Sequence, residues 1–184
     1  VVAVQEATQH PVRGEGGKSM SQWSDVKAMA AKGGYVATKA EVDSCRRNKC
    51  IHSGHILYKK ATIKQVDLPG KLPSAGQGRL SEITSGLHYA RNREFAWAYL
   101  EGLNGAGQFL AISVHLNNET NSIGKEDRQR VGRALTKWAK DLNKKSGMDN
   151  VPMILMGDFN SYVKREPKGM AYQLGKAGWL DSYN

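Results

Sequence analysis

Short apolar runs separated by polar segments recur along the chain and predict a series of strands. The runs at 1–4 and 153–156 are apolar at every position, which is typical of strands buried on both faces. Residues 95–100 instead alternate aromatic rings with alanines, and a Gly-rich turn then leads to the apolar run 109–114, so a hairpin is expected. Shorter strands are expected at 35–38, 56–58 and 62–66.

A helical period of apolar residues marks residues 125–145. Val131, Leu135, Trp138 and Leu142 lie on one stripe, so this stripe is expected to face the core. The opposite face carries basic residues and predicts a solvent-exposed cationic surface. This basic set consists of Arg128, Arg133, Lys137, Lys140, Lys144 and Lys145.

Two shorter helices are expected, at 23–31 and at 170–176. Ser24 and Asp25 cap the first of them in this interpretation, and a Gly-Gly pair ends it. Gly, Ser and Pro residues predict loops over 11–22 and over 69–78. Because strands and helices alternate in the second half of the chain, the α/β class is expected.

Length and charge narrow the classes of protein to consider. The 184 residues suit one domain, and a hydrophobic share of 40% excludes a disordered tail. No apolar run approaches the roughly 18 residues of a membrane-spanning helix, so no membrane span is expected. The protein is expected to be a monomer. Lys and Arg outnumber Asp and Glu by 27 to 17, and the resulting net charge of +10 favours polyanionic partners such as nucleic acid.

Both ends of the chain fall within patterns typical of buried elements. The chain opens inside the apolar run 1–4 without an initiator Met, and 178–184 resembles the start of a further buried element. We therefore expect residues 1–184 to form a single domain that is truncated at both ends.

Three of the apolar runs end in clusters of polar residues. Gln5 and Glu6 follow the first run, 115–118 follow the second, and 157–160 follow the third. Polar groups at strand ends commonly line sites in α/β folds, and these ends offer two carboxylates, an imidazole and several amides. This set suits the hydrolysis of a phosphoester with a hard divalent cation such as Mg²⁺.

Each cluster taken alone also has a plainer interpretation. Gly-Asp-Phe-Asn is typical of a turn, a single His after a strand is more often structural than functional, and a Glu at a strand end is usually solvated. The shared position of the three clusters, immediately after an apolar run, favours a joint site.

The same segments resemble the endonuclease/exonuclease/phosphatase superfamily, which includes deoxyribonucleases, apurinic endonucleases, sphingomyelinases and inositol polyphosphate phosphatases. The resemblance rests on Q-E at 5–6, S-V-H-L at 113–116 and M-G-D-F-N at 156–160, in that order. It extends from residue 1 to the end of the chain, although 11–90 match only in outline. It implies an α/β fold of four layers, α/β/β/α, in which helices flank a two-sheet sandwich.

The resemblance also implies a role for each motif residue. Glu6 matches the glutamate that binds Mg²⁺, and Asp158 matches the aspartate that aligns or activates the attacking water and shares the metal. His115 matches the residue that contacts the scissile phosphate, and Asn160 matches the asparagine that orients it. Mg²⁺ is therefore the expected cofactor, with Mn²⁺ or Ca²⁺ as alternatives.

Further phosphate contacts are expected from Arg93, with Arg91 as its rival, and from Asn118. Two parts of the superfamily pattern are missing from the sequence: an early strand with a metal-linked Asn, and a Ser-Asp-His segment whose histidine completes the catalytic set. Truncation at both ends is the simpler explanation for both absences.

Cys45 and Cys50 leave three alternatives open. A local disulfide is the first, unpaired thiols are the second, and a zinc site with His52 and His55 is the third, although C-x4-C-x-H-x2-H is not a usual zinc spacing. A disulfide would indicate a secreted protein; a cytoplasmic one is the alternative.

These observations together predict an enzyme, a Mg²⁺-dependent phosphodiesterase. A nuclease is favoured by the net charge of +10 and by the basic face of the 125–145 helix. The same core chemistry also suits a phospholipid or sugar-phosphate substrate. A protein of another class, a non-catalytic basic binding module with the same fold, is the remaining alternative.

Overall fold

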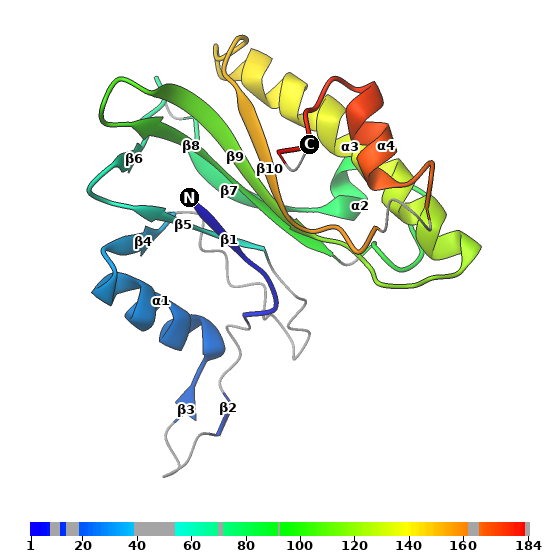
Figure 1. Ribbon diagram of the computed structural model, residues 1–184, viewed down its shortest axis with the longest axis horizontal. Coiled ribbons are helices and arrows are strands. Elements are labelled where there is room, and N and C mark those ends of the chain that lie inside the picture. The colour runs from blue at the N-terminus through cyan, green and yellow to red at the C-terminus, as the bar shows by residue number, and fades with distance from the viewer. Residues whose placement is uncertain are drawn as a thin grey trace.

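Two β-sheets stacked face to face, with helices on both outer sides, make up the protein (Figure 1). The computed structural model describes residues 1–7, 12–13, 19–38, 54–69, 72–91, 93–161 and 166–182. Helix α1 (Gln22–Lys32) covers the smaller sheet, and α3 (Ser122–Lys145) and α4 (Met170–Lys176) cover the larger one. The short helix α2 spans Leu80–Ile83. This arrangement confirms the expected α/β/β/α sandwich.

The larger sheet has five strands and the smaller sheet has three. The larger follows the order β10-β9-β8-β6, with β7 also paired to β8, and the smaller follows the order β1-β5-β4. The strands of the larger sheet are β6 Ile63–Gln65, β7 Ala75–Arg79, β8 Glu94–Gly102, β9 Gly107–His115 and β10 Met153–Asp158. The remaining strands are β1 Val2–Val4, β4 Tyr35–Ala37 and β5 His55–Lys59, with β2 Val12–Arg13 and β3 Ser19–Met20 as a separate pair.

Strand β8 separates two hydrophobic cores, as its alternation predicts. Phe95, Trp97 and Tyr99 pack on the α3 side with Val131 and Leu135. On the other face, the alanines of β8 pack against the smaller sheet in a cluster made of Ile56, Ala96, Ala98, Leu100 and Ala111. Small side chains at this face let the two sheets approach closely, whereas the rings fill the wider space beneath the helices.

The loop expected over 69–78 is partly wrong, because Ala75–Arg79 forms strand β7 along β8. Its two glycines, which suggested a loop, lie beneath aromatic rings of the neighbouring strand. A Cβ on Gly76 would lie 2.8 Å from the Trp97 ring, and a Cβ on Gly78 would lie 2.8 Å from the Phe95 ring. Glycine is therefore used here for close packing within a sheet.

Three further expectations need correction. The two fully apolar runs are not strands buried on both faces, because β1 pairs with β5 in the smaller sheet and leaves Val2 exposed, and β10 lies at the edge of the larger sheet and leaves Ile154 exposed. Helix α1 is capped by Ser21, which accepts a hydrogen bond from the Ser24 amide, so the cap lies three residues earlier than expected. Arg128 does not belong to the exposed basic face of α3, since its side chain is only 1% exposed.

The parallel pairing of β9 and β10 positions the candidate site. In its register Asp158 lies beside His115, at the carboxyl ends of both strands. Helix α3 then runs back along the larger sheet, and near its end Asn143 accepts a hydrogen bond from the Tyr99 hydroxyl (2.8 Å). Since Tyr99 pairs with Leu110, the last turns of α3 lie at the end of the sheet opposite to His115. Among the described residues, no helix is long and apolar enough to cross a membrane.

Candidate functional site

Three polar side chains from three strand ends meet at one edge of the sandwich. The Oε1 atom of Glu6, just after β1, lies 3.8 Å from His115 Nε2, and the Oδ2 atom of Asp158 lies 3.9 Å from the same nitrogen. The His115 side chain is 4% exposed, whereas those of Glu6 and Asp158 are 65% and 56% exposed. A buried imidazole thus lies beneath two carboxylates that solvent can reach.

Arg93, immediately before β8, approaches the other side of the same ring. Its Nη1 atom donates a hydrogen bond to His115 Nδ1 at 3.2 Å. Because a guanidinium has donors only, Nδ1 must be the accepting nitrogen, so the proton of the neutral ring lies on Nε2 and faces the carboxylates. Burial lowers the pKa of Arg93, and the nearby charges of Glu6 and Asp158 oppose that shift.

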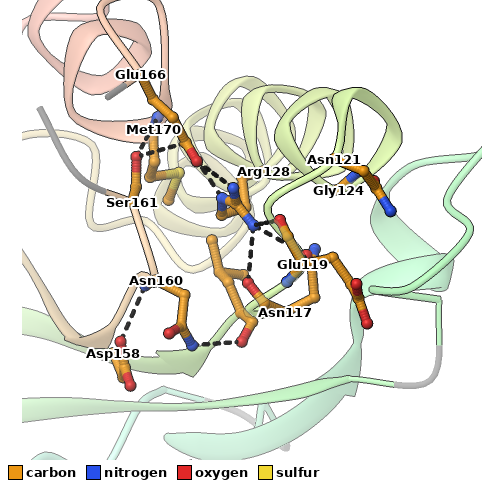
Figure 2. A network of polar contacts seen from close by, with 11 residues as sticks. Asn117, Glu119, Asn121, Gly124, Arg128, Asp158, Asn160, Ser161, Glu166 and Met170 are labelled. Atoms are coloured by element: carbon orange, nitrogen blue, oxygen red, sulfur yellow. Dashed lines mark hydrogen bonds and ion pairs between the residues drawn. The ribbon is translucent and has the colours of Figure 1, made fainter. Parts of the chain in front are cut away.

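Asn160 fixes Asp158 and connects the ends of β9 and β10. Its backbone N–H donates to Asp158 Oδ1 at 2.9 Å, and its Nδ2 donates to the carbonyl oxygen of Leu116 at 3.0 Å (Figure 2). The first bond leaves Oδ2 as the Asp158 oxygen that faces His115.

Backbone conformation is unusual at two residues of this site. Among the described residues, Glu6 (φ 60°) and Asn160 (φ 47°) are the two non-glycine residues with positive φ. Such left-handed conformations cost free energy in L-amino acids and concentrate at functional sites. Their occurrence at two residues that the sequence nominates is independent support for this site.

Gly157 allows β10 to reach β9 closely next to Asp158. A Cβ at this position would lie 1.9 Å from the carbonyl oxygen of Val114, and the φ of 133° is one that other residues rarely adopt. The glycine of the G-D-F-N motif is therefore required by the contact that brings Asp158 alongside His115.

The carboxylate pair fits the Mg²⁺ ion that the resemblance implies. Glu6 and Asp158 lie on one side of the same imidazole and are largely exposed, so water can complete a coordination shell around an ion held by two carboxylates. Across the described ranges, no three His, Cys, Asp or Glu side chains form a ready-made metal cluster. The donor set therefore suits a hard cation with mostly water ligands.

The other predicted site residues differ in their placement. Arg91 is exposed, whereas Arg93 contacts His115, so of the two rivals Arg93 is the one at the site. Asn118 is exposed in the segment after β9. Gln5 donates from Nε2 to the Ser113 hydroxyl at 2.9 Å and thereby links the end of β1 to β9. The disulfide candidates Cys45 and Cys50, and His52 with them, lie outside the described residues.

Sequence reasoning missed the buried charges beneath the site. Arg128 in α3 forms an ion pair with Glu166 and donates to the Asn117 carbonyl (3.0 Å) and the Glu119 carbonyl (2.8 Å) (Figure 2). The neighbouring Asp127 is also buried. One available signal is that positions 127 and 128 continue the apolar stripe of α3 one turn before Val131, and are therefore core positions.

Comparison with solved structures identifies the fold. A Bacteroides thetaiotaomicron endonuclease/exonuclease/phosphatase family protein is 24% identical over 76% of this chain and 46% of its own, with a TM-score of 0.54. A mannosyl-6-phosphatase from the same organism is 24% identical over 76% of this chain and 47% of its own, with a TM-score of 0.54. D. rerio TDP2, solved with a single strand DNA product, is 14% identical over 98% of this chain and 53% of its own, with a TM-score of 0.54.

No protein-family model and no curated protein matches the sequence itself. The chain spans about half the length of the structures it matches. The resemblance inferred from the three motifs is nevertheless confirmed at the level of the fold, because proteins described by that family name share its arrangement of sheets and helices. The chain has the fold of the endonuclease/exonuclease/phosphatase proteins.

Proposed function

We propose that the full-length protein containing this chain is a Mg²⁺-dependent phosphodiesterase, and that its substrate is nucleic acid. The observation that carries this proposal is the convergence of Glu6, Asp158, Arg93 and His115 at one edge of the sandwich. Glu6 and Asp158 supply two carboxylates that can bind a cation, and the other two side chains can donate hydrogen bonds to phosphate oxygens. Phosphoester hydrolysis uses both kinds of group.

Glu6 and Asp158 would hold the Mg²⁺ ion, which when bound supplies Lewis-acid polarisation of a phosphoryl oxygen. The Nε2–H of His115 would donate to a non-bridging oxygen of the phosphate, since Arg93 keeps Nδ1 as the acceptor. Asp158 Oδ2 would accept the proton of the attacking water, because Oδ1 already accepts the Asn160 amide. The water oxygen then forms the new bond to phosphorus as the bond to the leaving oxygen breaks, and the leaving oxygen departs with the bonding electron pair and takes a proton from solvent.

Two observations support nucleic acid as the substrate. The net charge of +10 raises the affinity for polyanions, and the similar D. rerio TDP2 structure contains a single strand DNA product. A sugar phosphate is the second candidate, because the mannosyl-6-phosphatase has the higher identity, 24% against 14%.

Substrate comparison by the full-length protein tests the proposal. Plasmid DNA, sphingomyelin and mannose 6-phosphate are each incubated with Mg²⁺, and EDTA provides the control. We expect nicking of DNA that EDTA abolishes. Turnover of the sugar phosphate or the lipid without DNA nicking would overturn the nuclease assignment. DNA binding without turnover of any of the three would favour the non-catalytic binding module.

A further inference from the structure

Two consecutive buried charges in α3, Asp127 and Arg128, contact the segments that carry the candidate site. Each of the two residues is 1% exposed, and both lie in the part of the helix nearest to the end of β9. Neither belongs to the set of groups proposed to contact metal or phosphate. Their partners are backbone groups and side chains of three different segments.

Arg128 connects the segment after β9 with the segment after β10. Its Nη1 donates to the Asn117 carbonyl (3.0 Å), the Asn117 Oδ1 (2.9 Å) and the Glu119 carbonyl (2.8 Å). The other side of its guanidinium pairs with Glu166, whose Oε2 also accepts from the Ser161 hydroxyl at 3.1 Å. Ser161 directly follows Asn160, and Asn117 lies two residues after His115, so one guanidinium fixes both segments (Figure 2).

Asp127 fixes the segment before β8 in a corresponding way. Its Oδ2 accepts from the backbone amides of His88 (3.0 Å), Tyr89 (2.7 Å) and Ala90 (3.0 Å), and its Oδ1 lies 3.2 Å from the first of these amides. The Arg93 amide in turn donates to the Ala90 carbonyl at 3.0 Å. The carboxylate thus orders the turn from which Arg93 reaches His115.

Stability alone is a weak explanation for these groups. A buried ion pair is often no more stabilising than well-packed apolar side chains of similar volume, because both charges lose their hydration. A planar guanidinium that bonds several fixed oxygens does, however, define the relative positions of the segments that carry them.

We propose that Asp127 and Arg128 are positioning residues, which set the geometry of the site from beneath: Arg128 places His115 relative to Asp158, and Asp127 places Arg93. This inference rests on the proposed function, since the site that they position is the proposed phosphoesterase site. It predicts that each residue controls its own segments and not the protein as a whole.

Hydrogen exchange of individual segments, measured on the full-length protein, tests this directly. Arg128→Lys keeps the charge but lacks the planar fork, so we expect exchange at 115–119 and at 158–161 to accelerate by about tenfold, with 86–91 unchanged. Asp127→Asn replaces an accepting oxygen with an amide, so the reverse pattern is expected, with acceleration at 86–91 only. If Arg128→Lys does not fold, Glu166→Gln tests the same two segments.

Tyr99→Phe is the matched control, because it removes a buried hydrogen bond at the opposite end of the same helix. It should accelerate none of the three segments relative to the rest of the protein. With DNA as substrate, Arg128→Lys should lower kcat by about 10- to 100-fold with a smaller change in KM, and Tyr99→Phe should lower neither. Uniform acceleration across the protein, or no acceleration, would overturn the inference. If the wild type hydrolyses no phosphoester, the proposed function fails. The exchange pattern then still shows whether Asp127 and Arg128 position their own segments.

Discussion

Arg93 determines which nitrogen of His115 carries the proton, because its guanidinium donates to Nδ1 at 3.2 Å and has no acceptor to offer. We predict that ¹⁵N spectra of the wild type show the Nε2–H tautomer at neutral pH, and that Arg93→Met gives a mixture of both tautomers. The loss of this donor should also lower kcat/KM by about 10²-fold to 10³-fold. Arg91→Met is the control, since Arg91 is exposed, and should change neither property. An unchanged spectrum in Arg93→Met would contradict this assignment.

Gly157 should tolerate no side chain. Gly157→Ala places a Cβ 1.9 Å from the Val114 carbonyl oxygen at a φ of 133°, so β10 must separate from β9. We expect a loss of at least about 3 kcal/mol in unfolding free energy, measured by urea denaturation. Gly175→Ala in α4 has open space around its Cβ and should be neutral or stabilising by up to about 1 kcal/mol. Equal stability of the two variants would show that the close approach of the strands is not required.

The burial of Tyr99 predicts that the protein loses stability at alkaline pH. Burial raises the pKa of Tyr99, and a hydrogen bond with the Ser146 side chain partly offsets this. The unfolded chain, whose tyrosine pKa is about 10, therefore ionises first, so this contribution is complete below pH of about 10 and is lost as the pH rises through the folded pKa.

Tyr99→Phe isolates this effect from other titrations. At pH 8 the variant should be less stable than the wild type by about 1–2 kcal/mol, because the Asn143 oxygen loses its donor. Above pH of about 10 the difference should shrink, since only the wild type pays for keeping the phenol neutral. Urea denaturation at pH 8 and at a pH above about 10 measures the difference in unfolding free energy between the variant and the wild type. A difference that grows with pH would contradict the burial effect.

The exposed lysines of α3 should contribute little to catalysis. Lys144 and Lys145 lie in the last turn of the helix, at the end of the larger sheet opposite to His115. The combined variant Lys140→Gln, Lys144→Gln, Lys145→Gln should change kcat/KM on DNA by less than about threefold at physiological salt, because charges beyond a Debye length of about 8 Å are screened. A loss of more than about tenfold would place the DNA path across α3.

Much of the fold could be predicted because its elements are strongly periodic. Alternation on β8 predicted the two-sided packing of this strand, and the helical stripe around Val131 and Leu135 predicted α3. Strand β7 could not be predicted from its glycines. They are required because aromatic rings of the neighbouring strand leave no room for a Cβ, and this contact exists only once the chain has folded.

The candidate site, like the fold, could be predicted from the sequence only in part. Glu6, His115 and Asp158 could be nominated because each follows an apolar run, and their meeting depends on the register of β9 and β10. Basic residues on helices usually face solvent, so the sequence predicts an exposed Arg128, yet its ion-pair partner Glu166 lies 38 residues further along the chain. Which charged residue is buried depends on these tertiary contacts.

The carboxylate pair carries the central claim, and titration of Mg²⁺ into the full-length protein by calorimetry tests it most directly. Glu6→Gln keeps the shape of the side chain and removes its charge, and Asp149→Asn removes an exposed charge near the start of β10, away from the site. We predict binding heat in the wild type and in Asp149→Asn, and its loss in Glu6→Gln together with the loss of phosphoester hydrolysis. Identical heats in the wild type and Glu6→Gln would contradict the assignment of Glu6 to the metal.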